Sequence, residues 1–361
     1  MPTNNSNNKI KAVVVDDSAF MRKSITIMLE SDPDIKVIGT ARDGEEGYNI
    51  IKSLRPDIVT LDIEMPKMDG ITALKKIMID CPTSVLMLSS LTTEGADITI
   101  KALELGAVDF IPKELSFINV NIIKIKEELI AKIKEIVKQR VIRDRLKRIQ
   151  KLNQFSPLAQ TKSFSTGSLP AMTYQAIGLG ISTGGPFSLQ KVIPQLSKKI
   201  RCPIFIVQHM PPKFTKSLAD RLNGLSELEV KEAEDGEVVH GGVIYMAPGG
   251  LHMTLNKTVL GKITIKISSE PGTTLHRPSV DVMLDSVLDV YGKNTLGIIM
   301  TGMGKDGFEG IKKLKSLGGN CIAQDEGSCV VYGMPKAVVD AGFADVVAPL
   351  EKISEIINKA F

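Results

Sequence analysis

The chain has 361 residues, of which 43% are hydrophobic, and its formal net charge is +4. This length suggests two domains, and the composition excludes a wholly disordered chain. No apolar run approaches the roughly 20 residues that a membrane span needs, and the polar first nine residues predict no signal peptide. The sequence therefore predicts a two-domain protein without membrane insertion.

The cysteines and the basic residues restrict the class of protein further. Cys81, Cys202, Cys321 and Cys329 show no Cys-x-x-Cys spacing, which argues against a zinc site or a disulfide framework. Reduced thiols of this kind favour a cytoplasmic location. Residues 124–151 contain eleven Lys or Arg against four Asp or Glu. Such a charge run is usually a solvated helix face, so we predict no nucleic-acid partner.

Short apolar runs alternate with helical patterns along the first third of the chain. Segments rich in Val and Ile predict five strands, at 11–17, 35–41, 57–63, 84–90 and 107–113. Between them apolar residues recur at helical spacing, as in 18–31 and 69–80. This alternation predicts a doubly wound α/β domain, in which a parallel sheet has helices on both faces.

A basic amphipathic helix is predicted next, from about residue 119 to about residue 149. Residues 154–173 follow it; they are rich in Ser, Thr and Pro and have no periodicity, which is typical of a linker. We therefore expect the domain boundary between about residues 140 and 172.

The alternation resumes in the second half. Strands are predicted at 174–182, 202–209, 242–248, 295–302 and 320–326, and a β-hairpin is predicted within 253–269. A second doubly wound parallel α/β domain is expected from this pattern.

Polar side chains stand at the ends of the first set of strands. Asp16 and Asp17 end the first strand, Asp62 the third, Ser89 the fourth and Lys113 the fifth. Functional residues of parallel sheets lie outside these carboxyl ends. Three carboxylates at one edge repel one another unless a divalent cation lies among them, and such hard oxygen ligands suit Mg²⁺. Lys113 and Ser89 could contact a transferred phosphoryl group.

These residues resemble the receiver domain of bacterial response regulators. The resemblance rests on Asp16-Asp17-Ser18, residues 61–66 (Leu-Asp-Ile-Glu-Met-Pro), Asp69-Gly70, Ser89-Ser90 and Lys113, and it covers roughly residues 9–135. It implies a flavodoxin-like fold in which a histidine kinase phosphorylates Asp62. It also implies that Asp16, Asp17 and Asp62 hold the Mg²⁺ needed for phosphorylation.

Three strands of the second half end in residues that can activate a nucleophile. Ser182 follows the first of them, His209 follows the second, and Asp306 lies in a glycine-rich loop after a third. If these strands are parallel neighbours, the three side chains meet at one edge of the sheet. His209 would then take the proton of Ser182, and Asp306 would orient the imidazole. Backbone amides at Thr183 and Met303 are candidate donors to an oxyanion.

The same residues also bear on other classes of protein. Gly178, Gly180 and Gly184 after a strand would also suit a dinucleotide loop, but residues 195–210 lack the acidic residue that binds ribose. The chain order Ser, His, Asp differs from that of α/β-hydrolases. A receiver joined to a DNA-binding module would show a short helix-turn-helix unit rather than a long α/β pattern. An amidase with the same triad remains open, because esters and amides share one oxyanion.

The second half resembles the chemotaxis protein-glutamate methylesterase family. The resemblance rests on residues 180–186, 207–212, 246–250, 276–281 and 300–307, and it spans about residues 172–358. It implies a Rossmann-like catalytic domain that needs no cofactor. The implied activity is hydrolysis of glutamate γ-methyl esters on methyl-accepting chemotaxis receptors, with deamidation of receptor glutamines. The expected domains are a receiver at 9–135, a helix end and linker at 136–171, and a catalytic domain at 172–358.

The roles of the remaining histidines are open. His276 and Arg277 could line a substrate groove or bind an acidic receptor helix, or they could form ordinary loop hydrogen bonds. His252 is equally undecided, and His240 is predicted to be a turn residue. From the domain order we also hypothesise that the unphosphorylated receiver blocks access to Ser182 and that phosphorylation of Asp62 relieves the block.

Overall fold

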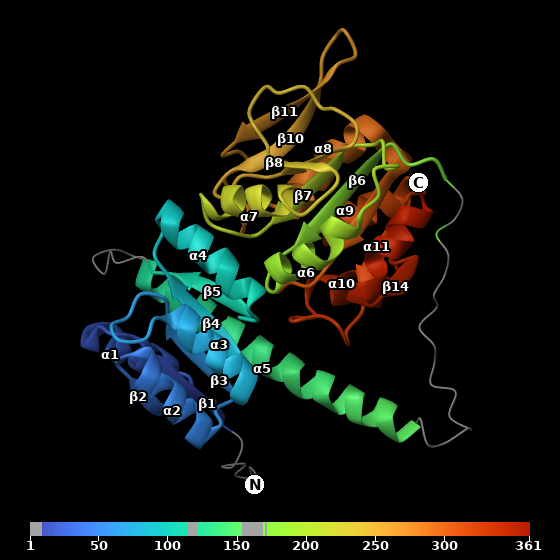
Figure 1. The fold of residues 1–361 in the computed structure, drawn as a ribbon. Coiled ribbons are helices and arrows are strands. Elements are labelled where there is room, and N and C mark those ends of the chain that lie inside the picture. Colours follow the sequence, from blue (N-terminus) through green and yellow to red (C-terminus); the bar gives the residue numbers. More distant parts are fainter. Residues whose placement is uncertain (1–8, 114–120, 154–168, 170–171) are drawn as a thin grey trace. The chain divides into compact units, whose positions relative to one another are not determined.

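The computed structural model describes residues 9–113, 121–153, 169 and 172–361 (Figure 1). The chain divides into two compact units, Met1–Arg140 and Val141–Phe361. Both contain a parallel sheet with helices, so the predicted fold class of two doubly wound α/β domains is confirmed.

The first unit contains a five-stranded parallel sheet in the order β2-β1-β3-β4-β5. Its strands carry buried Val, Ile and Leu on both faces, as a sheet between two helical layers requires. The elements are β1 (Ile10–Val15), α1 (Ala19–Glu30), β2 (Ile35–Ala41), α2 (Gly44–Leu54), β3 (Ile58–Asp62), α3 (Gly70–Asp80), β4 (Ser84–Ser89), α4 (Thr93–Glu104), β5 (Asp109–Pro112) and α5 (Asn121–Asn153).

The helices of this unit begin at polar residues that follow the strands. Ser18, Asp43, Asp69 and Thr92 are the N-caps of α1 to α4, and each side chain accepts a hydrogen bond from a backbone amide of the first turn. Such caps satisfy donors that would otherwise lack a partner at the start of a helix. The same turns that cap the helices therefore fix the carboxyl edge of the sheet.

Helix α5 covers the range predicted for a basic helix. Its first half packs on the first unit, where Leu129 and Ile133 are buried and Lys132 forms a 3.0 Å ion pair with Asp109. Arg140 Nη1 donates to the carbonyl of Asp57 at 3.1 Å. Most of the linker predicted at 154–173 lies outside the described residues.

The second unit contains a seven-stranded sheet in the order β14-β13-β12-β6-β7-β9-β8, with every pair parallel. A separate antiparallel hairpin, β10-β11, is confirmed where the alternating pattern predicted it. The elements are β6 (Ala176–Ile181), α6 (Gly185–Val192), η1 (Ile193–Gln195), β7 (Ile204–Gln208), α7 (Phe214–Asn223), β8 (Glu229–Glu232), β9 (Val243–Met246), β10 (His252–Lys257), β11 (Ile263–Ser268), α8 (Val280–Tyr291), η2 (Gly292–Asn294), β12 (Thr295–Ile299), α9 (Phe308–Ser316), β13 (Asn320–Gln324), α10 (Met334–Asp340), β14 (Val346–Ala348) and α11 (Leu350–Lys359).

The two edge strands were not predicted. β8 has the polar sequence Glu-Val-Lys-Glu, and β14 has only three residues. Edge strands can be short and charged because only one side of each pairs with a neighbour. Neither strand therefore shows the apolar run on which the sequence prediction relied.

Helix α8 lies unusually close to β6. A Cβ atom at Gly178 would stand 2.5 Å from Leu284 Cδ2, and one at Gly180 would stand 2.4 Å from Val280 Cγ1. Any larger residue at either position would push the helix off the strand. These glycines, which also fitted a dinucleotide loop, therefore serve helix–sheet packing.

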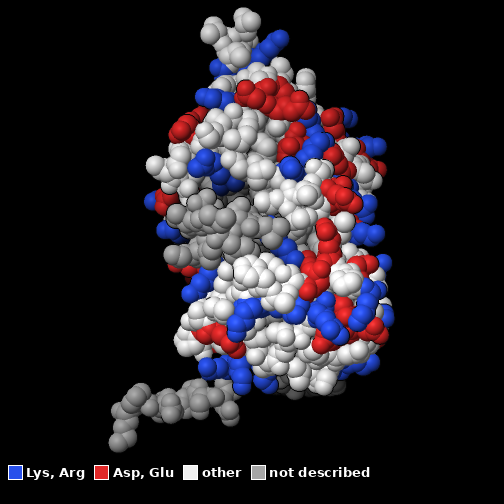
Figure 2. Space-filling model, turned by 90° about the vertical axis from the view of Figure 1, so that its left-hand side faces the viewer, with Lys and Arg blue, Asp and Glu red and all other residues white. Residues whose placement is uncertain are grey.

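Charged side chains of both signs are interspersed on the face shown in Figure 2, rather than gathered in one basic surface. Among the described residues, no helix is both long and apolar enough to cross a bilayer.

Gly249 offers a test of how tightly the loop after β7 is packed. A Cβ there would lie 2.3 Å from the carbonyl carbon of Pro211. We expect Gly249→Ala to lower the free energy of unfolding of the second unit by about 1–3 kcal/mol through overpacking.

The matched control is Gly224→Ala at the end of α7. There φ is −67° and the nearest atom to a new Cβ is 3.6 Å away. The change should leave stability equal or raise it by up to about 1 kcal/mol. Equal effects of the two variants in denaturant titrations would contradict the packing argument.

Candidate functional sites

Asp16, Asp17 and Asp62 converge at the carboxyl edge of the first sheet. β1 and β3 are parallel neighbours, and one carboxylate oxygen from each of the three residues lies within 4.8 Å of the others. Asp16 and Asp62 are buried, whereas Asp17 is exposed. The structure thus brings together the acidic cluster that the strand ends predicted, and the cluster is typical of a Mg²⁺ site.

Lys113 joins this cluster from the end of β5. Its Nζ forms ion pairs of 2.7 Å with Asp16 Oδ2 and with Asp62 Oδ2. The Lys113 amide also donates to the carbonyl of Ser89 at 2.6 Å, which ties the ends of β4 and β5 together. The lysine therefore balances part of the negative charge of the two buried carboxylates.

Burial raises the pKa of Asp62 from 3.8 to about 6, although Lys113 opposes the shift. The nearby Asp16 carboxylate also raises it, while the backbone amide of Ile63 donates to Oδ1 at 2.7 Å and lowers it. Asp62 is consequently ionised at neutral pH, although burial weakens its preference for the charged form.

Ser89 lies beside this cluster but is fully buried. Its hydroxyl accepts a 2.6 Å hydrogen bond from Thr99 Oγ1 of α4. It also donates at 3.2 Å to the carbonyl of Ser90. Ser89 is thus linked to the middle of α4.

The second candidate site is formed by three adjacent strands. β6 lies between β12 and β7, and Ile181 pairs with Gln208. Ser182 and His209, the next residues along each strand, therefore stand side by side at the carboxyl edge. The loop after β12 reaches the same place, because a Cβ on Gly302 would lie 2.8 Å from Ser182 Cβ.

The turn that carries Ser182 depends on glycine. Gly184 has φ +75°, and a Cβ on Gly185 would lie 1.8 Å from the Gln208 amide oxygen. The Ser182 amide donates to the carbonyl of Thr301 at 2.9 Å, and Gln208 Nε2 donates to the carbonyl of Ser182 at 3.0 Å. The backbone of the serine is therefore held from both neighbouring strands.

The two predicted oxyanion donors have free amides. In the part of the chain that the structure describes, the backbone N–H groups of Thr183 and Met303 make no hydrogen bond. Thr183 follows Ser182 directly, and Met303 follows Gly302, which touches Ser182. The Ser182 amide is already used by Thr301, so these two amides are the better candidates.

His209 and Asp306 form a close pair. His209 Nε2 donates to Asp306 Oδ2 at 2.8 Å, and both side chains are largely buried. His209 Nδ1 is also buried, and it has no hydrogen-bond partner among the described residues. An imidazole that donates through Nε2 keeps Nδ1 as an acceptor, so this atom can receive the proton of a neighbouring hydroxyl.

The first turn of α8 binds the Asp306 carboxylate. Ser279 Oγ donates to it at 2.9 Å, the Val280 amide at 2.7 Å and the Asp281 amide at 3.0 Å. Burial alone would raise the pKa of Asp306, but His209 and these amides hold it well below its ordinary value. Burial and the Asp306 charge raise the pKa of the neighbouring Asp281. Asp306 is therefore the member of this acidic pair that stays ionised.

Several supporting residues were missed or left open by the sequence. Gln208 and Thr301 hold the Ser182 turn; Gln208 precedes the predicted His209 directly, and Thr301 lies two residues before the predicted Met303. Buried His252 accepts at Nδ1 from the Ser279 amide at 3.2 Å, and burial lowers its pKa. The His276 ring stacks on His209, with centroids 4.3 Å apart. No local sequence signal places these two histidines at the site.

Two other polar residues, His240 and Arg277, are exposed. His240 is exposed in the segment before β9, where its amide donates to the Tyr245 hydroxyl at 2.8 Å. Arg277 is exposed, and its carbonyl accepts from the Gly250 amide at 3.1 Å.

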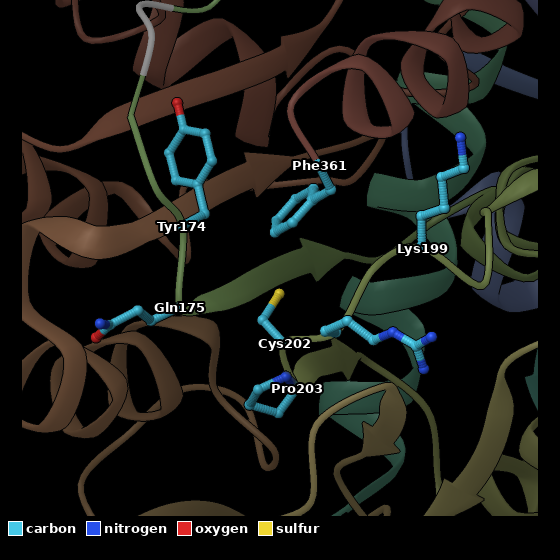
Figure 3. A pocket seen from close by; sticks show the side chains of 7 residues that line it. Tyr174, Gln175, Lys199, Cys202, Pro203 and Phe361 are labelled. Carbon is cyan, nitrogen blue, oxygen red and sulfur yellow. The ribbon is translucent and has the colours of Figure 1, made fainter.

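A hollow of about 430 Å³ opens at the opposite edge of the second sheet (Figure 3). Its lining includes Tyr174, Cys202 and Phe361, and it stands where β6 and β7 begin. Ser182 and His209 follow the other ends of these strands. The hollow is therefore separate from the edge that carries Ser182 and His209.

Comparisons with known proteins match both units. The family described as CheB methylesterase matches residues 177–357, and the family described as response regulator receiver domain matches residues 12–122. A protein-glutamate methylesterase/protein-glutamine glutaminase 1 of Oleidesulfovibrio alaskensis is 47% identical over 97% of this chain and 99% of its own length. One from Pyrococcus horikoshii is 47% identical over 98% and 94%. The crystal structure of the Thermotoga maritima CheB methylesterase catalytic domain has 47% identity and a TM-score of 0.50, covering 53% of this chain and 100% of that one.

The raised pKa of Asp62 predicts a specific pH dependence of stability. Its protonated form favours the folded state, so this contribution is complete below pH 3.8 and is lost as pH rises through about 6. Asp62→Asn removes the buried charge. We expect its effect on the free energy of unfolding to be more stabilising at pH 8 than at pH 4, by about 1–3 kcal/mol.

Asp97→Asn on the exposed face of α4 is the matched control, and its effect should stay flat over this range. Hydrogen exchange of β3 amides in the full chain measures the difference. A pH-independent effect of Asp62→Asn would show that burial does not control this carboxyl group.

Proposed function

The chain belongs to the CheB methylesterase family with an N-terminal receiver domain, and we propose that phosphorylation of Asp62 controls a serine esterase centred on Ser182. Its activity is that of a protein-glutamate methylesterase and protein-glutamine glutaminase in chemotaxis adaptation. The single observation that supports the residue assignment best is the buried His209–Asp306 pair, with Nδ1 unpartnered among the described residues and Ser182 on the adjacent strand.

In the first step, Ser182 Oγ attacks the carbonyl carbon of a glutamate γ-methyl ester, and His209 Nδ1 takes the hydroxyl proton. The negative charge that develops on the carbonyl oxygen is stabilised by the amides of Thr183 and Met303. Asp306 balances the imidazolium charge through Nε2–H, and it is suited to this because it remains ionised.

The intermediate then collapses and expels the leaving group. His209 returns the proton to methoxide, methanol departs, and an acyl-enzyme remains on Ser182. Water hydrolyses this ester by the same proton route, which releases the glutamate carboxylate and restores the hydroxyl. With a glutamine side chain the leaving group is ammonia, and the other steps are unchanged.

The first unit supplies the control. Asp62 accepts a phosphoryl group from a histidine kinase of the chemotaxis pathway, and Asp16, Asp17 and Asp62 would hold the Mg²⁺ that the transfer needs. When bound, the ion would screen the carboxylates from the incoming phosphoryl oxygens. Lys113 binds one of those oxygens. Ser89 transmits the effect of phosphorylation to α4 through its hydrogen bond with Thr99.

The substrates are methyl-accepting chemotaxis receptors, and the reaction takes place in the cytoplasm. We place the receiver at residues 9–135, the helix end and linker at 136–171 and the catalytic domain at 172–358. The family matches at 12–122 and 177–357 fall within these limits.

Removing the nucleophile tests the catalytic assignment. Ser182→Ala should lower kcat for a methylated receptor peptide by about 10⁴-fold or more, because the attacking oxygen is absent. Ser316→Ala, at an exposed position near the end of α9, should leave kcat unchanged. Near-normal turnover by Ser182→Ala would remove this residue from the mechanism.

Removing the phosphoacceptor tests whether phosphorylation regulates the esterase. A small phosphodonor with Mg²⁺ should raise the esterase rate of the full chain, and Asp62→Asn should abolish that increase. Asp97→Asn keeps the acceptor and should respond like the unaltered protein. Equal activation of Asp62→Asn by the donor would place the regulatory site elsewhere.

A further inference from the structure

One segment of the second unit holds both members of the His209–Asp306 pair. Ser279, Val280 and Asp281 donate to the Asp306 carboxylate, and three residues earlier the ring of His276 lies on the ring of His209. The two rings are inclined by only 22°, so they meet face to face. Residues 276–281 therefore contact both members of the pair: they donate hydrogen bonds to Asp306 and stack a ring on His209.

The loop that carries His276 is itself anchored. Fully buried His252 donates from Nε2 to Thr274 Oγ1 at 3.1 Å, and its Nδ1 accepts from the Ser279 amide at 3.2 Å. His252 thus binds the loop on both sides of His276. The position of the His276 ring follows from this buried framework, although the ring itself is partly exposed.

Stacking has a geometric consequence for His209. The hydrogen bond from Nε2 to Asp306 fixes one atom of the imidazole, but it still allows the ring to tilt about that bond. A second flat ring at 4.3 Å restricts the tilt and covers one face from water. Nδ1 is then kept in the direction of the adjacent strand end, where Ser182 stands.

Stacking also has an electrostatic consequence. His209 becomes a cation whenever it takes the serine proton. A neutral imidazole can lie against that cation, whereas a second imidazolium at this separation opposes it. An imidazole is the side chain that changes charge between about pH 5 and 8.

From the stack and the anchored loop we propose that His276 is a positioning residue for His209 and that the esterase works only while His276 is neutral. The inference rests on the function proposed above for Ser182 and His209. It adds a second imidazole whose protonation stops the reaction at acidic pH.

Other charged groups near His276 enter the same pH dependence. They come from the loop after β7, the segment after β11, β10 and the loop after β12. Arg277 follows His276 in the chain, His252 anchors the loop and is influenced by Glu270, and Asp306 binds the partner ring of His209.

Two substitutions separate the ring from its charge. His276→Phe keeps a flat ring that cannot be protonated, and His276→Ala removes the ring. For the unaltered chain, log(kcat/KM) for a methylated receptor peptide should rise with a slope of two at the acid end, because both imidazoles must lose a proton. His276→Phe should reduce the slope to one and keep kcat/KM within about threefold at pH 8.5.

Above the acid limb, His276→Ala should lower kcat about two- to tenfold with little change in KM, as expected for the loss of one aromatic contact, and its slope at the acid end should be one. His276→Tyr replaces the Phe variant if that protein does not fold. His240→Phe, at an exposed histidine outside the site, is the matched control and should keep the slope of two. Ratios to the unaltered full chain cancel any pH effect of the receiver.

The inference is overturned if His276→Phe keeps the slope of two, or if His276→Ala matches the unaltered chain at every pH. Ser182→Ala is measured alongside. Residual turnover in that variant would overturn the serine mechanism and the inference with it. An inactive Ser182→Ala together with an unchanged slope in His276→Phe would overturn the inference alone.

Discussion

The close approach of α8 to β6 is the constraint on which the edge with Ser182, His209 and Asp306 depends. Gly180 of the strand leaves room for Val280 of the helix, and the amide of that same Val280 donates to Asp306. A helix displaced by a single methyl group would carry its first-turn donors away from the carboxylate. Asp306 would then keep its burial and lose the contacts that hold it ionised. The close packing of α8 on β6 thus also places the donors that keep Asp306 ionised.

Two buried carboxylates of this chain show how partners decide the outcome of burial. Burial acts on Asp62 and Asp306 in the same direction, yet the pKa of Asp62 is raised and that of Asp306 is lowered. Asp62 lies beside the Asp16 carboxylate, and the two share the ammonium group of Lys113. Asp306 instead accepts hydrogen bonds from a histidine, a hydroxyl and several backbone amides. The first arrangement suits the phosphoacceptor role proposed for Asp62. The second suits the role proposed for Asp306, which must keep its charge beside a histidine that gains a proton.

Strand ends were the most informative part of the sequence. Apolar runs locate the inner strands, and the rule that parallel strands share a carboxyl edge is enough to bring Ser182, His209 and Asp306 to one place. The edge strands β8 and β14 were not predicted, because an edge strand can pair without an apolar run. His276 escaped for another reason, since its place on His209 is set by a loop that is anchored at buried His252. Contacts of that kind depend on tertiary packing, which local periodicity does not encode.

The direction of proton transfer follows from which imidazole nitrogen is already occupied. Because Nε2 donates to Asp306, only the buried Nδ1 remains as an acceptor, and in the mechanism proposed above it takes the serine proton. The ring could turn over only by giving up both the 2.8 Å hydrogen bond and the stack on His276. His209 and Asp306 are 97 residues apart in the chain, so this choice exists only once β12, β6 and β7 are aligned. The fold therefore fixes the tautomer of His209 as well as the place of Ser182.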